Sequence, residues 1–305
     1  MTKNLAKYRL IDNSIMTLDE RIRKDVEERL SGKEISAAKA LAPVVAKMKS
    51  SFATSGFSTK GLPGYFCGDK NARTIVVNLN PGMDAKMADD LWSDKTKDFD
   101  HSSVEAFIKD ILTHSKNFGF EDEDRFDEFD VKQAAFLTPW KDSGIDLPQE
   151  PDWNDRENTC LKAKKNVLYQ KLQLELIPYA SAKFEIVKDK NTRELFLPYI
   201  DTLLEEIFSK PRLYVIFASA IFEDLFKIYN TSNNSQTFVI PREDQKVQLK
   251  EGGRKAKFKV IEINYNGKVQ KALIAHTFPS QGLSWAFDLM QKYGKACYDE
   301  FIKIP

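Results

Sequence analysis

The amino-acid sequence predicts an α/β protein in three layers, α/β/α, with a mainly parallel central sheet between two layers of helices. Runs of strand-forming residues alternate along the chain with segments of helical periodicity, which is the pattern of βαβ units. Two of these runs, at 74–79 (TIVVNL) and 213–217 (LYVIF), are almost wholly apolar, as in strands that are buried on both faces. The 305 residues are enough to bury one large core or two smaller ones.

The first sixty residues are expected to form an N-terminal helical extension, followed by one α/β domain over residues 61–305. Thr17 and Glu20 have the spacing of a capping box, and apolar residues at helical spacing follow them. Gly32 then ends this helix.

The other elements are assigned from periodicity and turn residues. A second helix is predicted over residues 36–49, kinked at Pro43 because proline lacks the N–H that a helix interior needs. Asn266 and Gly267 are typical of a two-residue hairpin turn. Further strands are expected at 134–137, 172–177, 257–265 and 268–275, and further helices at 83–92, 104–113, 200–208, 221–226 and 283–301.

Charge and cysteine content narrow the classes of function. Lysine and arginine number 46 against 45 aspartate and glutamate, so any nucleic-acid surface must be a local patch. The three cysteines are far apart and form no CxxC pair, so we expect no cysteine-based metal or iron–sulfur site, and no cofactor. The acidic run at 121–130 has no histidine and no EF-hand spacing, and we interpret it as a solvated face.

The sequence also bears on where the protein works. No run approaches about 18 apolar residues, and the first residues lack an apolar stretch of signal-peptide type. We therefore expect a cytoplasmic protein without a membrane partner, and dispersed cysteines fit such a reducing compartment. The sequence does not indicate an oligomeric state.

The first candidate for a functional site is the segment NLNPG, which comes at the end of a predicted buried strand. Its residues lie at the carboxyl end of that strand, where ligands bind in open α/β sheets. Pro81 fixes the turn, Gly82 lets a ligand approach the backbone, and the amide of Asn78 or Asn80 can hold a water or a polar ligand. The alternative is an ordinary turn, for which Asn-Pro-Gly is equally suited.

The second candidate is the segment HTFPSQGLS at 276–284, which also follows a strand and precedes a helix. His276 is one of three histidines and could donate a hydrogen bond to a leaving group, the alternative being a structural histidine at a strand end. Tyr179 and Ser181 in LIPYAS also follow a predicted strand and are placed in the same cleft, again with a simple turn as the alternative. The lysine-rich stretch 246–259 could meet phosphates, or could be a hairpin whose edge is protected by lysines.

Taken together, the two candidate segments resemble the uracil-DNA glycosylase superfamily. LNPG resembles the first motif, G-x-N-P-G, of its mismatch-specific uracil/thymine branch, and PSQGLS resembles that branch's second motif, N-P-S-G-L-S, with Gln281 inserted. The resemblance runs from about Tyr65 to the end of the chain, although only these two turns are specific. It implies a glycosylase-like α/β/α fold and hydrolysis of the N-glycosidic bond of a base that is flipped out of DNA.

The resemblance also implies roles for single residues. Asn80 would orient the attacking water, and Leu283 would be the wedge that fills the gap left by the extruded base. If Pro279 and Ser280 match the Pro-Ser of the second motif, Phe278 stands where that motif has a polar residue. If His276 is matched instead to the histidine of the H-P-S form, it would contact the leaving base, with two residues inserted. Asn78 stands where the first motif has glycine. The expected substrate-binding residues are Asn78, Pro81, Gly82, Tyr179, Ser181, Phe278 and Ser280, and the expected DNA-binding residues are Gly282, Leu283 and Ser284.

The expected function is therefore that of a DNA glycosylase in base excision repair, with DNA as partner and a deaminated or damaged base such as uracil as substrate. Two alternatives stay open. The chain could be a nucleic-acid- or nucleotide-binding protein that keeps the fold without the chemistry. It could also hydrolyse free nucleosides or nucleotides, which its near-zero net charge favours. Neither the lesion nor the strand preference follows from the sequence.

Overall fold

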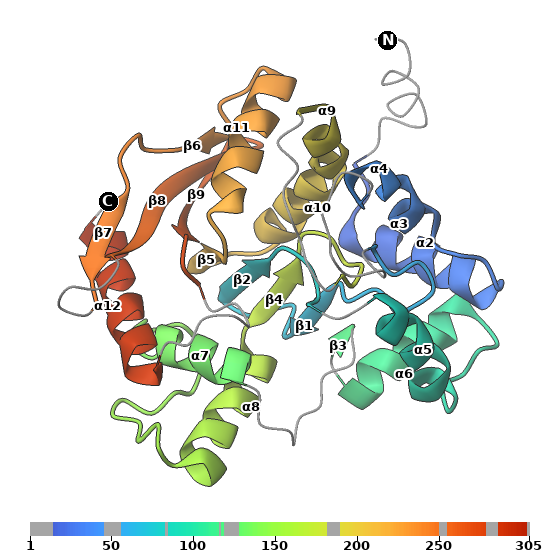
Figure 1. Ribbon diagram of the computed structural model, residues 1–305, viewed down its shortest axis with the longest axis horizontal. Helices are drawn as coiled ribbons and strands as arrows, with labels where there is room; N and C mark the ends of the chain where they lie inside the picture. Colours follow the sequence, from blue (N-terminus) through green and yellow to red (C-terminus); the bar gives the residue numbers. More distant parts are fainter. Residues whose placement is uncertain are drawn as a thin grey trace.

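The fold is α/β, with one mixed sheet at its centre (Figure 1). The computed structural model describes residues 15–45, 56–82, 85–115, 117–118, 128–181, 190–249, 255–278 and 286–303. Across these residues the strand order is β3-β1-β4-β2-β5-β9-β8-β6, and β7 pairs with β8 beside this path. The strands are β1 (Phe66–Gly68), β2 (Thr74–Asn78), β3 (Asn117–Phe118), β4 (Leu172–Glu175), β5 (Tyr214–Phe217), β6 (Phe238–Val239), β7 (Gln245–Gln248), β8 (Lys255–Tyr265) and β9 (Lys268–Ala275).

Helices occupy the connections between these strands. The longer ones are α2 (Leu18–Leu30), α5 (Ala85–Thr96), α6 (Val104–Ser115), α7 (Glu128–Leu137), α8 (Leu161–Gln170), α10 (Leu197–Phe208), α11 (Ile221–Asn233) and α12 (Phe287–Lys303). The shorter ones are α3 (Ser36–Ala40), α4 (Ala42–Val45), α9 (Lys190–Arg193), the π-helix η1 (Arg156–Cys160) and the 3₁₀ helix η2 (Glu194–Phe196).

The middle of the sheet is parallel, as the sequence predicts. Strand β2 is parallel to β4 on one side and to β5 on the other, and β5 is parallel to β9. From β2 the chain continues to β4, which lies on one side of β2, and then to β5, which lies on the other side of β2. The gap between β2 and β5 is a topological switch point, and ligands bind at the carboxyl ends of strands beside such points.

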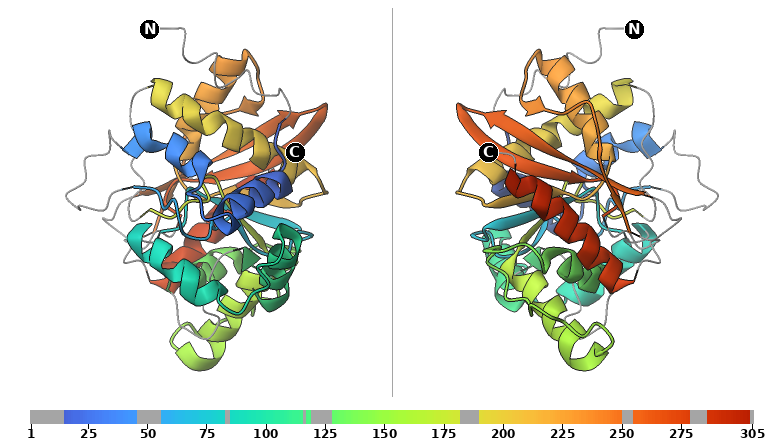
Figure 2. Two further views of the ribbon diagram at one scale, coloured as in Figure 1. Left: turned by 90° about the vertical axis from the view of Figure 1, so that its right-hand side faces the viewer. Right: turned by 90° about the vertical axis from the view of Figure 1, so that its left-hand side faces the viewer.

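Helices cover both faces of this sheet, which Figure 2 shows from two sides. Successive β2 residues point to opposite faces, because side chains alternate along a strand. Ile75 and Val77 join the cluster that contains buried side chains of α2, α10 and α11. Val76 joins the cluster that contains α7, α8 and α12. The expected sheet between two helical layers is therefore confirmed at the level of the α/β class.

The N-terminal helices pack against the same core as the strands. The capping box is present as predicted, since Thr17 accepts from the N–H of Glu20 and Glu20 accepts from the N–H of Thr17. Ile22 and Val26 of α2 are buried in the cluster that contains β2 and β5. Residues 36–45 of the predicted second helix form two short helices, α3 and α4, that separate at Leu41, and residues 46–49 lie outside the described residues. Pro43 lies in the first turn of α4, where its missing N–H costs nothing, so it does not kink a continuous helix.

One predicted strand is wrong. Residues 134–137 form the end of helix α7, not a strand, and residues 130–137 of that helix are all buried. Burial on every side removes the helical periodicity by which a half-exposed helix is recognised. The packing is close, because a Cβ on Gly294 of α12 would lie 1.9 Å from the carbonyl oxygen of Phe136.

The hairpin prediction is confirmed, while the acidic run needs a partial correction. Asn266 and Gly267 both have positive φ, as a two-residue turn between β8 and β9 requires. Residues 121–127 of the acidic run lie outside the described residues. Asp130 is buried and accepts a hydrogen bond from Gln133, so it does not belong to a solvated face. None of the described helices is both long and apolar enough to cross a membrane.

Candidate functional site

The candidate site is the carboxyl edge of the parallel strands. Val77 of β2 pairs with Phe217 of β5, which in turn pairs with Ile274 of β9. The three strands therefore end level with one another. The loop after β2 (residues 79–82, the first loop) and the turn after β9 (residues 276–278, the His276 turn) leave the same edge, with the loop after β5 between them.

The first loop runs beside the loop after β4 (residues 176–181, the second loop). Ile177 donates its N–H to the carbonyl of Leu79 at 2.8 Å, and Ser181 donates to the carbonyl of Pro81 at 3.1 Å. A glycine is needed at position 64, next to the first loop, because a Cβ there would lie 2.8 Å from the ring of Pro81. Backbone hydrogen bonds thus hold the two loops together as one wall of the edge.

Asn80 is half-buried within this wall, and its amide nitrogen is turned toward the protein. The Nδ2 group donates to the carbonyl of Pro81 at 3.0 Å and lies 3.4–3.5 Å from those of Tyr179 and Ser181. Among the described residues none donates a hydrogen bond to Oδ1. An amide fixed in this way keeps one acceptor for a water or a ligand.

Asn78 and Tyr179 are engaged elsewhere. Asn78 is buried and donates its amide N–H to Glu175 of the neighbouring strand at 3.0 Å. Tyr179 is 1% exposed, and its hydroxyl donates to Asp25 of α2 at 2.9 Å. Tyr65 donates to the same carboxylate oxygen at 2.6 Å. We call Asp25, Tyr65 and Tyr179 the Asp25 cluster. Its hydrogen bonds connect helix α2 to the second loop.

The remaining predicted site residues are placed as follows. Pro81 is half-buried and Gly82 is exposed in the first loop, while Ser181 is buried at the end of the second loop. Phe278 is 3% exposed and packs edge-on against Phe136 of α7 with ring centroids 4.8 Å apart, so its ring belongs to the core. Ser280, Gly282, Leu283 and Ser284 lie outside the described residues.

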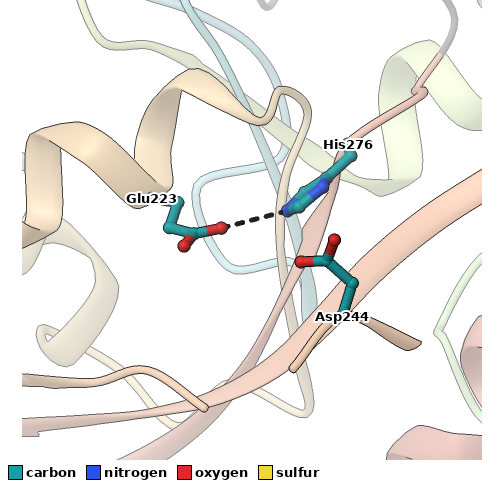
Figure 3. Close-up of side chains that lie close together, drawn as sticks. All are labelled: Glu223, Asp244 and His276. Carbon is teal, nitrogen blue, oxygen red and sulfur yellow. Dashed lines mark ion pairs between the residues drawn. The ribbon is translucent and has the colours of Figure 1, made fainter. Parts of the chain in front are cut away.

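His276 lies in a group of charged side chains on the other side of the edge (Figure 3). Its Nε2 is 3.5 Å from a carboxylate oxygen of Glu223, in the first turn of α11, and makes no hydrogen bond with the described residues. Atoms of Glu223, Asp244 and His276 all come within 4.8 Å of one another. The side chain of His276 is 12% exposed. We call these residues with Lys259 the His276 cluster.

Lys259 of β8 supplies the opposite charge. It is 2% exposed, and its ammonium is 3.0 Å from Glu223 and 3.5 Å from Asp244. It also donates to the carbonyl of Pro241 at 2.8 Å. A buried ammonium needs such a full set of acceptors, because desolvating it is expensive.

The charges of this cluster set its pKa values. Burial alone would raise the pKa of Glu223, but hydrogen bonds from Lys227 and Lys259 outweigh it and leave that pKa below the ordinary value. The pKa of Asp244 is lowered too, because Lys257, His276 and Lys259 outweigh the effect of burial. Burial lowers the pKa of His276, although Asp244 and Glu223 oppose this effect.

Glu223, Asp244 and His276 are also a possible set of metal ligands. A histidine with two carboxylates offers suitable donor atoms. The ammonium of Lys259, however, already lies between the two carboxylates and offsets their charge. A metal ion would have to displace this lysine, and the donor set therefore fits an internal ion-pair network better than a metal centre.

Glu223 and Asp244 were not predicted from the sequence, and Lys259 was expected only as part of the lysine-rich stretch 246–259. Glu223 follows a buried phenylalanine in an ordinary amphipathic helix, and Asp244 lies in a polar loop. Lys259 carries a weak signal, since it interrupts an apolar strand. Three separate strand pairings bring them to His276: β8 with β9 places Lys259, β7 with β8 places Asp244, and β5 with β9 places the helix that carries Glu223.

No family model matches the chain, and no curated protein matches it.

Proposed function

We propose that this protein hydrolyses the N-glycosidic bond of a base in DNA, at the carboxyl edge between the first loop and the His276 turn. The proposal keeps the uracil-DNA glycosylase-like arrangement that the two motifs suggest. The observation that carries it is that the first loop and the His276 turn, which precedes the second motif in sequence, leave one edge of one sheet beside its switch point.

Asn80 has the features needed to position the attacking water. Its Nδ2 is held by loop carbonyls, and its Oδ1 accepts no hydrogen bond from the described residues. An amide oxygen in a fixed orientation can accept a hydrogen bond from one water and so aim a lone pair of that water at the sugar. Positioning of this kind requires no acid–base chemistry from the loop itself.

His276 has the features needed to stabilise the leaving base. Cleavage of the bond places negative charge on the base, and a donor aimed at that charge lowers the barrier. When protonated, the imidazole forms an ion pair with Glu223, whose carboxylate lies 3.5 Å from Nε2, and the N–H on its Nδ1 can donate to the base. Glu223 and Asp244 then offset the charge of the imidazolium.

The test is release of free base from oligonucleotides. Purified full-length protein is incubated with duplex and single-stranded oligonucleotides that carry uracil, other deaminated bases or oxidised bases, and with the matching free nucleosides. We expect free base from at least one oligonucleotide. Release from free nucleosides alone would move the activity to nucleoside hydrolysis. Binding of oligonucleotides without release from any of them would contradict the proposal and favour the binding-protein alternative.

A further inference from the structure

The paired strands β7 and β8 form a two-stranded ribbon beside the candidate site. Phe258 pairs with Ala275, and the N–H of His276 donates to the carbonyl of Lys257 at 3.1 Å. Lys255 and Ala256 of β8 pair only with β7. Since β8 is antiparallel to β9, these residues lie beyond His276, and the ribbon projects about 7 Å past it at 3.3–3.4 Å per residue.

The face of the ribbon on the His276 side is basic. Lys257 and Lys259 alternate with buried Phe258, so they share a face, and Lys255 lies on the same face. Lys246 of β7 is directly opposite Lys257. Lys246 and Lys255 are exposed and have no ion pair with any described residue, whereas Lys257 pairs with Asp244 at 3.1 Å.

Protection of a sheet edge accounts for only part of this arrangement. Lysines on edge strands prevent unwanted pairing, and Lys246 on β7 and Lys255, which pairs with β7 alone, could serve that purpose. Lys257 is not at an edge, because β7 pairs with it on one side and the N–H of His276 bonds to its carbonyl on the other. Directly opposed like charges such as Lys246 and Lys257 also destabilise a sheet. Asp244 offsets part of the charge of Lys257, and an anion that lies over the ribbon would offset the remaining repulsion.

We infer that the face formed by Lys246, Lys255 and Lys257 binds the phosphodiester backbone of a nucleic-acid strand. The choice of partner rests on the proposed function, because a strand whose base reaches His276 would pass directly over this ribbon. The near-zero net charge of the chain makes a local patch of this kind necessary for binding DNA.

The experiment measures binding of a labelled oligonucleotide of roughly 20 nucleotides, single-stranded and duplex, between about 50 and 200 mM salt. The variant is Lys246→Gln/Lys255→Gln, which leaves the ion pair between Lys257 and Asp244 in place. The control is Lys33→Gln/Lys268→Gln, which removes the same charge from exposed positions on the loop after α2 and on the β8–β9 turn. Melting temperatures are compared to confirm that both variants fold.

We expect the ribbon variant to raise Kd about tenfold near 100 mM salt, and to reduce the salt slope by about 1.5, which is the share of two phosphate contacts. The control should change Kd less than about twofold. Equal binding by the two variants, or no binding by wild type, would overturn the inference. So would lysine-dependent binding to phosphatidylglycerol vesicles without binding to oligonucleotides.

Base release separates this inference from the proposed function. If wild type binds DNA through the ribbon but releases no base from any lesion, the inference stands and the proposed function fails. If wild type releases base and the ribbon variant binds like wild type, the proposed function stands and the inference fails.

Discussion

The acidic side chains of the Asp25 cluster and of the His276 cluster are stabilised in opposite ways. Asp25 is 2% exposed and receives hydrogen bonds from the neutral hydroxyls of Tyr65 and Tyr179. Burial raises its pKa to about 6 against these hydrogen bonds. In the His276 cluster, Lys259 makes ion pairs with both Glu223 and Asp244, and their pKa values are lowered.

This difference shows how each group can be used. The tyrosine hydroxyls donate hydrogen bonds to the Asp25 carboxyl but carry no charge, so only a proton can neutralise this carboxyl. The Asp25 cluster thus acts as an anchor between α2 and the second loop. Ammonium groups keep the carboxylates of the His276 cluster ionised at neutral pH. The carboxylates of the His276 cluster therefore stay ionised to lower pH than Asp25, on the side of the edge where we place the chemistry.

The largest expected effect concerns Asp25 and pH. A carboxyl whose pKa rises from 3.8 in the unfolded chain to about 6 in the fold favours the folded state when protonated. Its contribution to stability is fully present below about pH 4 and is lost as the pH rises through about 6, a total of about 3 kcal/mol. In urea unfolding, the wild type should therefore lose stability relative to Asp25→Asn over this range. Asp98→Asn, at an exposed position, should follow wild type, and a parallel course of wild type and Asp25→Asn would refute the anchor.

A smaller loss of stability is expected from Lys259→Met. Removing the ammonium leaves Glu223 and Asp244 close together with less compensation. We expect a loss of about 2 kcal/mol, below the 3–5 kcal/mol typical of a broken buried pair, because Glu223 keeps Lys227. Lys268→Met on the exposed turn is the control. The triple variant Lys259→Met/Glu223→Gln/Asp244→Asn should recover part of the stability at pH 7, and an unchanged free energy of unfolding for Lys259→Met would show that the ion pairs contribute nothing.

The smallest expected effect is on the titration of His276. Asp244 raises the pKa of this histidine against the lowering by burial, so Asp244→Asn should lower it further. The chain has three histidines, and NMR titration can therefore follow His276 with His101 and His114 as internal references. If His276 acts in its protonated form, the rate of base release by wild type should fall as the pH rises through the pKa of His276. In Asp244→Asn this limb of the pH–rate profile should move to lower pH. A limb that stays in place would exclude His276 as the titrating group.

Local signals in the sequence predicted much of the fold. The Thr17–Glu20 capping box, the Asn266-Gly267 turn and the strand beginning at Thr74 are all found, because each depends on residues close together in the chain. Helix α7 was missed because all of residues 130–137 are buried, which erases the periodicity by which helices are recognised.

The candidate site was harder to predict than the fold. The sequence located both loops at strand ends, but it could not show that Tyr179 turns to Asp25 or that Phe278 packs on Phe136. The sequence contains a weak signal for Asp25, because it is a charged residue three positions after Ile22 on the apolar face of α2. For the His276 cluster the sequence indicated His276 and the lysine-rich stretch but not Glu223 or Asp244, since the members come from α11, the loop before β7, β8 and the turn after β9.

The central claim is that the first loop and the His276 turn act on one N-glycosidic bond, and Asn80 tests it most directly. The measurement is single-turnover release of base from the best oligonucleotide substrate by wild type, Asn80→Ala and the exposed control Asn154→Ala, with oligonucleotide affinity measured alongside. Because the amide of Asn80 matters mainly in the transition state, Asn80→Ala should release base about 100-fold more slowly, or slower still, with Kd almost unchanged. Asn154→Ala should match wild type. If Asn80→Ala releases base as fast as wild type, the chemistry does not belong to this loop, and the account of the site is wrong.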